Sequence, residues 1–149
     1  MRIMEPKPGT YALILRCDVT RRLRIGQLGE MTAQPGWYIY IGSAFGPGGV
    51  RGRVHRHRRR AKRTHWHIDH LRKITTFVEV WYTHDPTPRE HDWARALAAS
   101  PGATIPLPGF GASGCPCATH LLFFTARPAL RAFRGRLVAH EPHQILSEK

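Results

Sequence analysis

Two short apolar segments, each carrying tyrosine and bounded by turn-forming residues, most constrain the fold of this chain. Residues 9–16 (GTYALILR) and 37–41 (WYIYI) are rich in aromatic and β-branched side chains. Such side chains favour extended backbone. Pro35 and Gly36 precede the second segment and Gly42 follows it, so the segment is limited to the length of a strand. We therefore expect a β-sheet built on tyrosine-bearing strands.

The other segments predict helices around that sheet. Further strands are expected at residues 23–28, 31–33, 75–82 and 120–125. Helices are expected at residues 50–62, 66–74, 87–99 and 128–139, with a loop rich in Gly and Pro at 101–117 and a frayed tail at the end. This mixture predicts an α+β fold, a small, mainly antiparallel sheet flanked by helices. No repeat or linker divides the chain, so residues 1–149 are expected to form a single domain with a motif-bearing core at about 9–125.

The charge of the chain predicts an anionic polymer as its partner. Lys and Arg total 23 against 10 Asp and Glu, a formal charge of +13. Residues 31–68 contain no acid, and residues 51–63 contain eight Arg or Lys together with His55 and His57. The alternative is a solvated, arginine-rich face, but ordinary surfaces mix both signs of charge.

The composition also favours a reducing compartment. No apolar run approaches the length of a bilayer-spanning helix, and the first ten residues contain no apolar signal region. The three cysteines do not resemble a disulfide framework. We expect a cytoplasmic, nucleoid-associated protein that does not act at a membrane.

The order of residues along the first third of the chain suits phosphodiester chemistry. Hydrolysis needs a base or an oriented water, a cation on the phosphate, and commonly a metal held by a carboxylate. Tyr11 and Tyr40 lie on expected strands, and Gly42 allows close backbone approach. Arg53 and His57 follow four residues apart, on one face of the expected basic helix. Together these side chains would form a phosphate cleft.

This ordered set resembles the GIY-YIG nuclease superfamily. The matching stretches are Gly9-Thr10-Tyr11, Tyr40-Ile41-Gly42 and Val50-x-x-Arg53-x-x-x-His57. More narrowly the chain resembles the DUF123 branch, some of whose archaeal members are fused to an endonuclease III-type repair domain. That resemblance rests on residues 36–44, His65-Trp66-His67-Ile68-Asp69, and Gly109-Phe110-Gly111-x-Ser113-x-Cys115-x-Cys117-x-x-His120-Leu121.

The resemblance implies DNA hydrolysis with one divalent ion, Mg²⁺ or Mn²⁺. Tyr11 would be the base or would orient the water, Tyr40 would support it, and Arg53 would bind the scissile phosphate. The family's metal carboxylate falls on Glu90 or Asp92. Glu90 is at helical spacing from the apolar residues Trp93, Ala94 and Leu97 and should face the sheet, whereas Asp92 should not.

Several residues near these motifs are expected to contact nucleic acid. They are Gly42, Ser43, Arg51, Arg56, Arg58, Arg59, Lys62, Arg63 and His67. DNA is the expected partner through the resemblance, and RNA is not excluded. Because a domain of this size has little surface for base-specific contacts, we expect recognition of shape or lesions, or targeting by a repair-protein partner.

A second metal is suggested by Cys115, Cys117 and His120. Cysteine and histidine are the usual ligands of zinc, although a buried loop of small, soft side chains is an equal explanation. Two other functions therefore stand beside the nuclease. One is a nucleic-acid-binding module without catalysis, and the other is a zinc-stabilised structural domain.

Overall fold

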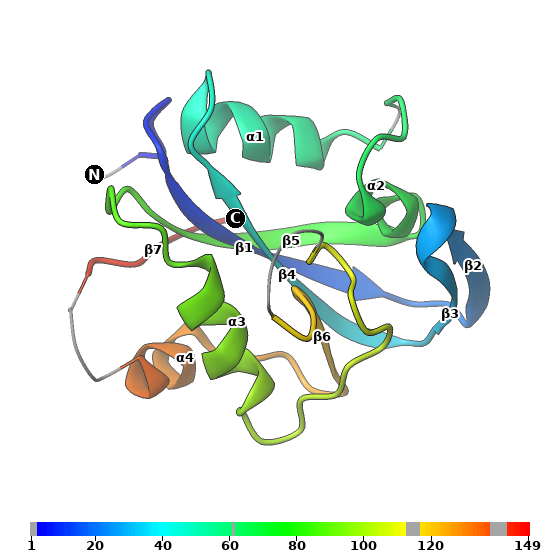
Figure 1. The fold of residues 1–149 in the computed structure, drawn as a ribbon. Coiled ribbons are helices and arrows are strands. Elements are labelled where there is room, and N and C mark those ends of the chain that lie inside the picture. The colour runs from blue at the N-terminus through cyan, green and yellow to red at the C-terminus, as the bar shows by residue number, and fades with distance from the viewer. Residues whose placement is uncertain (1–2, 61, 113–116, 138–142) are drawn as a thin grey trace.

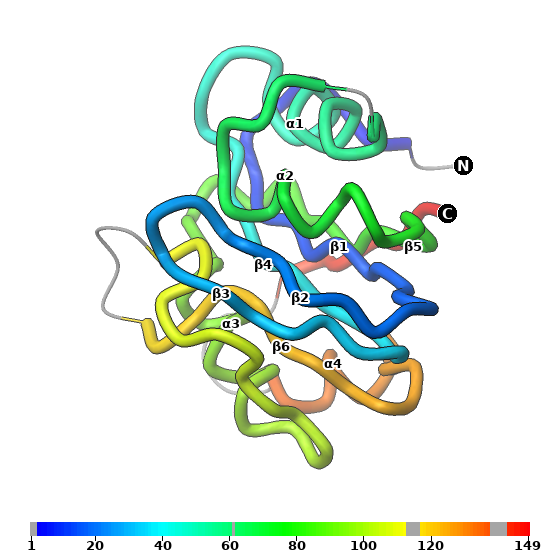
Figure 2. The backbone as a smooth tube through the Cα atoms, turned by 90° about the vertical axis from the view of Figure 1, so that its right-hand side faces the viewer, coloured from blue at the N-terminus to red at the C-terminus, as the bar shows by residue number. Residues whose placement is uncertain are grey.

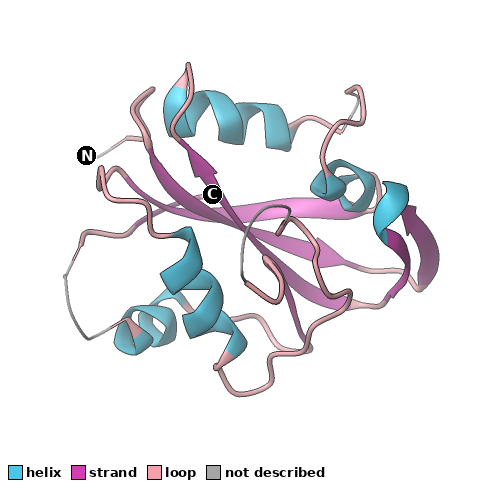
Figure 3. Cartoon of the chain, in the orientation of Figure 1, coloured by secondary structure: helices cyan, strands magenta, loops and turns pink. Residues whose placement is uncertain are grey.

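A five-stranded antiparallel sheet with a pair of helices on each face forms the framework of the protein (Figures 1 and 3). The computed structural model describes residues 3–60, 62–112, 117–137 and 143–149. The strand order is β6 (Leu121–Phe124), β4 (Gly36–Ala44), β1 (Gly9–Cys17), β5 (Thr75–Thr83) and β7 (Leu146–Glu148). The predicted α+β class is confirmed.

The two tyrosine-bearing segments form the centre of this sheet. β1 pairs with β4 from Gly9 opposite Ala44 to Cys17 opposite Gly36, and pairs on its other side with β5. Both central strands are buried along almost their whole length. This explains their continuous apolar composition, because helices cover both of their faces.

Alternate residues of the central strands enter two separate cores. Leu13, Leu15 and Tyr38 pack on one face beneath α1 (Gly49–Arg58) and α2 (His67–Arg72). On the other face, Ile14 and Ile39 pack against α3 (Glu90–Ala98) and α4 (Leu130–Arg136). The period-two alternation of a strand therefore assigns each side chain to one helix pair.

A small hairpin lies beside α2, as Figure 2 shows. It consists of β2 (Arg21–Ile25), the 3₁₀ turn η1 (Gly26–Leu28) and β3 (Gly29–Ala33). The strands expected at residues 23–28 and 31–33 fall within this hairpin, although residues 26–28 form the 3₁₀ turn and do not extend the first strand. None of the helices in the described part of the chain is long and apolar enough to cross a membrane.

Three expectations about segment ends were wrong. The basic helix ends at Arg58 rather than at residue 62, because Arg59 is already extended. The end of the chain is not a frayed tail, since β7 adds an edge strand to β5, with Glu148 opposite Val80. The last helix is also shorter than expected, spanning Leu130–Arg136.

Candidate active site

A pocket of about 360 Å³ lies where the two central strands meet the starts of two helices. It collects side chains from β1, β4, α1, α2 and α3. Its walls are Tyr11, Tyr40, Ile41, Gly42, Ser43, Arg53, His65, Trp66, His67, Glu90, Gly111 and His120. The pocket thus contains both tyrosines, the arginine and the preferred carboxylate of the sequence-based prediction.

Tyr11 is held in the pocket by Gly42 and His57. Tyr11 and Gly42 are directly opposite one another in the sheet. A Cβ atom on Gly42 would lie 2.4 Å from the Tyr11 hydroxyl, so only glycine leaves room for the ring. The hydroxyl is 2.9 Å from Nε2 of His57, which is fully buried in α1. Gly42 was expected to admit a ligand, but in this structure it admits the tyrosine.

Tyr40 and Tyr38 share a sheet face but have different surroundings. Tyr40 lines the pocket and contacts the His57 ring edge-on, with 6.0 Å between ring centroids. Tyr38 packs on Phe123, and its hydroxyl accepts a hydrogen bond from the Gln34 N–H at 3.0 Å. Tyr40 is therefore the tyrosine of β4 that lines the candidate site.

Burial keeps the three central side chains neutral. It raises the pKa of Tyr11 well above its ordinary value, and the neighbouring Tyr40 adds to this effect. Burial likewise raises the pKa of Tyr40. The pKa of His57 falls to about 3, because burial disfavours the imidazolium. Near pH 7 the two phenols of the pocket are therefore protonated and the imidazole buried behind Tyr11 is uncharged, while Arg53 supplies positive charge.

Arg53 lines the pocket and is held there by contacts that include Ser43 and Trp66. Its Nη1 donates to the Ser43 carbonyl at 3.2 Å, and its guanidinium carbon lies 4.6 Å from the centroid of the Trp66 ring. Arg56 stacks on the same ring at 4.2 Å. A cation held by a backbone carbonyl and an aromatic face keeps free N–H groups for an anion.

Asp69 anchors the segment that carries Trp66. Its carboxylate accepts hydrogen bonds from Nη1 and Nη2 of Arg56 at 3.0 and 2.9 Å, and from the N–H groups of His65 and Trp66, both at 2.8 Å. Burial would raise the pKa of Asp69, but these hydrogen bonds lower it to about 2. Asp69 therefore stays ionised and joins α1 to α2.

The end of α1 is capped by Arg72, a residue that the sequence did not single out. Arg72 is buried, and its guanidinium donates to the carbonyls of His57 at 2.8 Å and Arg58 at 3.2 Å. A cation at a helix C-terminus offsets its unpaired carbonyls and dipole. Arg72 thereby fixes the turn of α1 that carries His57.

Glu90 and Asp92 take different positions on α3. Glu90 lines the pocket, with 24% of its side chain exposed, and its Oε2 lies 3.9 Å from Nδ1 of His120. Asp92 points away and pairs with Arg95 at 3.0 Å on the surface. The apolar stripe of α3 packs on the sheet as expected, on the face opposite to Tyr11 and Tyr40. Glu90, the first residue of α3, nevertheless lines the same pocket as these tyrosines.

A known family model matches most of this chain. The model of the family described as "Domain of unknown function DUF123" matches residues 10–140. The chain belongs to the DUF123 family. Every residue of the pocket wall, from Tyr11 to His120, lies within the matched region. Comparison with curated proteins and with solved structures found no match.

The basic tract of this DUF123 domain divides between the pocket and other surfaces. Arg51 and Arg58 lie beside a separate hollow near the C-terminus, where Arg58 contacts Glu148 at 3.3 Å. Arg59 and Arg63 are exposed, and Lys62 donates to the Arg59 carbonyl. Of the expected nucleic-acid contacts, Gly42, Ser43 and His67 line the pocket, whereas Arg56 is paired with Asp69.

His67 and His70 of this DUF123 domain serve different neighbours. Nδ1 of His67 accepts a hydrogen bond from the Gly111 N–H at 2.9 Å, which ties the pocket wall to the long loop. His70 lies near Gly26 in the hairpin region.

The expected zinc ligands are only partly described. Cys115 lies outside the described residues. Cys117 and His120 lie close to His91, which the sequence reasoning missed, and the ligand atoms of these three residues are all within 4.8 Å of one another. His91 follows Glu90 directly in the sequence, and this adjacency to the candidate metal carboxylate was the available signal.

Proposed function

We propose that this DUF123 domain is a metal-dependent endonuclease of the GIY-YIG type that hydrolyses phosphodiester bonds in DNA. One observation carries the proposal: Tyr11, Tyr40, Arg53 and Glu90 come from four separate elements and line one pocket. A phenol, a guanidinium and a carboxylate supply the three functions that the reaction requires. The formal charge of +13 supports a polyanionic substrate.

The pocket suits a hard divalent cation such as Mg²⁺ or Mn²⁺. Mg²⁺ commonly binds through one or two carboxylates, with water and substrate phosphate oxygens completing its shell. Glu90 offers one partly exposed carboxylate in the pocket and would hold the ion. When bound, the ion would polarise the phosphate and acidify a coordinated water.

Arg53 and the tyrosines would divide the remaining work. The Arg53 guanidinium would bind the scissile phosphate and stabilise the charge that develops on its oxygens during attack. Since burial raises the pKa of Tyr11, its hydroxyl enters the reaction protonated. Tyr11 would therefore orient the attacking water by a hydrogen bond rather than act as a phenolate. His57, at 2.9 Å, would fix the direction of that hydroxyl.

Nucleic-acid binding without cleavage is the competing function. It is favoured by the neutrality of Tyr11 and His57, whose pKa values are shifted away from the range of an efficient base at pH 7. The same basic residues would serve binding and cleavage. The two functions therefore differ in product, not in affinity.

A cleavage assay on several DNA structures separates the two functions. Duplex, nicked, branched and single-stranded DNA, with single-stranded RNA beside them, would be incubated with Mg²⁺, with Mn²⁺ and with EDTA. The nuclease proposal predicts metal-dependent cleavage of at least one DNA. Retardation of DNA in gels without cleavage under any metal condition would instead support the binding module, and salt-sensitive affinity would accompany either function.

A further inference from the structure

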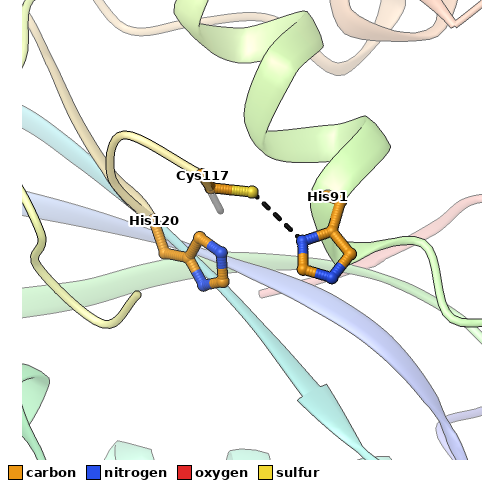
Figure 4. A group of neighbouring side chains, drawn as sticks. All are labelled: His91, Cys117 and His120. Atoms are coloured by element: carbon orange, nitrogen blue, oxygen red, sulfur yellow. Dashed lines mark hydrogen bonds between the residues drawn. The ribbon is translucent and has the colours of Figure 1, made fainter. Parts of the chain in front are cut away.

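The side chains of His91, Cys117 and His120 converge beside the candidate active site. His91 lies in the first turn of α3, whereas Cys117 and His120 come from the segment that leads into β6 (Figure 4). Nδ1 of His91 lies 3.1 Å from Sγ of Cys117. One ligand atom from each residue lies within 4.8 Å of the others. Two segments therefore bring three metal-ligating groups together, although His91 and Cys117 are 26 residues apart in the sequence.

The spacing of these atoms is close to that of a zinc site. Zinc binds sulfur at about 2.3 Å and nitrogen at about 2.0 Å, so tetrahedral ligands are about 3.5 Å apart. The observed pair at 3.1 Å and the outer limit of 4.8 Å bracket this value. Side-chain rotations moving the ligand atoms by about 1 Å would bring them to three of the four tetrahedral positions, and water would be the fourth ligand.

The donor set distinguishes this cluster from the Glu90 position. A thiolate and two imidazoles are soft or borderline ligands that favour zinc, whereas Mg²⁺ takes oxygen ligands. Nδ1 of His120 lies 3.9 Å from Oε2 of Glu90, so the candidate metal carboxylate borders this cluster. A carboxylate beside the second nitrogen of a ligating histidine is common around metal sites, because it orients the ring.

We propose that His91, Cys117 and His120 bind a zinc ion that is separate from the divalent ion of the proposed nuclease. Binding would deprotonate Cys117 and release that proton to solvent. The ion would join the first turn of α3 to the segment before β6. His91 follows Glu90 in the sequence, and His120 faces the Glu90 carboxylate. Zinc would therefore act on the active site by positioning Glu90.

Metal analysis of the full chain tests the site without reference to nuclease activity. The protein would be purified without an affinity tag and its zinc measured by mass spectrometry, with about one ion per chain expected. Cobalt added to the zinc-free protein should give the intense thiolate-to-metal absorption and tetrahedral visible bands of a cysteine-containing site. His91→Ala and Cys117→Ser should each lose most of the zinc and alter those bands.

Matched variants control for general effects of substitution. His55 is exposed on α1, so His55→Asn should retain zinc. Cys17 is buried in β1 and donates to the Val19 carbonyl, a bond that serine keeps, so Cys17→Ser should also retain it. Wild-type protein with little zinc and no cobalt–thiolate absorption would overturn the proposal, as would full zinc content in Cys117→Ser. A zinc-containing protein that never cleaves DNA would contradict the nuclease proposal alone.

Discussion

The hydroxyl of Tyr11 lies 2.9 Å from Nε2 of His57, and both side chains are buried. Among the described residues, Nδ1 of His57 has no hydrogen-bond partner. An unpaired buried N–H is rarer than an unpaired acceptor, so the favoured tautomer carries its hydrogen on Nε2 and donates it to Tyr11. The phenolic hydrogen is then free to point into the pocket, toward a bound water or phosphate.

The burial of His57 makes the stability of the domain depend on pH. Its pKa is about 3 in the folded protein and about 6.5 in an unfolded chain. Between these values the unfolded chain binds a proton that the folded protein does not, so stability falls as the pH falls. From pH 7 to pH 5 this histidine should remove about 2 kcal/mol of unfolding free energy. Urea denaturation at the two pH values measures the loss.

Variants of two histidines on α1 identify the source of that loss. His57→Gln cannot titrate, so its stability should fall by about 2 kcal/mol less over the same interval. His55→Gln, at an exposed position, should show the wild-type dependence. Burial also lowers the pKa values of His67, His70 and His120, which leaves a residual slope of the same sign. An unchanged slope in His57→Gln would contradict this assignment.

The fit of Tyr11 over Gly42 predicts opposite effects for two glycine substitutions. Gly42→Ala would place a methyl group 2.4 Å from the Tyr11 hydroxyl and should destabilise the fold by about 1–3 kcal/mol. Gly52→Ala meets no atom within 4 Å in the middle of α1. It should stabilise the fold by up to about 1 kcal/mol, since alanine favours helix. Thermal unfolding of both variants measures the two effects. Equal changes in melting temperature for Gly42→Ala and Gly52→Ala would refute the packing argument.

The Asp69 carboxylate should be a major support of the pocket wall. Asp69→Asn weakens the Arg56 pair and the bonds from His65 and Trp66, and should cost about 3 kcal/mol, because Asp69 is almost fully buried. Asp92→Asn is the control, since its pair with Arg95 is exposed and should contribute less than about 1 kcal/mol. Denaturant titration at pH 7 compares them. A loss in Asp92→Asn as large as that in Asp69→Asn would show that burial does not decide the effect.

Local patterns were sufficient to predict the sheet and the direction of Glu90. Aromatic and β-branched segments gave β1 and β4, and the spacing of Glu90 with Trp93 and Leu97 placed its carboxylate toward the sheet. These features depend on periodicity within one element, and that information is present in a short stretch of sequence.

Long-range pairings could not be predicted in the same way. The partnership of Asp69 with Arg56 depends on the path of the turn between α1 and α2. The contact of His91 with Cys117 depends on how the long loop returns to α3. β7 forms only because the edge of β5 is available to it. In each case the contact depends on a partner in a distant segment, so the composition of the local segment could not predict it.

Substitutions of the exposed basic residues and of the pocket arginine should change the salt dependence of nucleic-acid affinity by different amounts. If Arg51, Arg59 and Arg63 contact the nucleic-acid backbone, replacing all three by Ala should weaken binding and lower the salt dependence of affinity by about two to three units of log–log slope. Arg53→Ala alone should change that slope by at most about one unit. Fluorescence anisotropy from low to moderate salt measures both values. An unaltered slope in the triple variant would exclude these residues from the binding surface.

In the proposed nuclease Arg53 and Glu90 act together on a phosphodiester, and single-turnover cleavage of DNA with Mg²⁺ tests this role most directly. Arg53→Ala and Glu90→Gln should each slow cleavage by about 100-fold or more, while circular dichroism shows both variants to be folded. The controls Arg131→Ala and Glu30→Gln, at sites away from the pocket, should cleave at the wild-type rate. Cleavage by Arg53→Ala and Glu90→Gln at the wild-type rate would contradict the account.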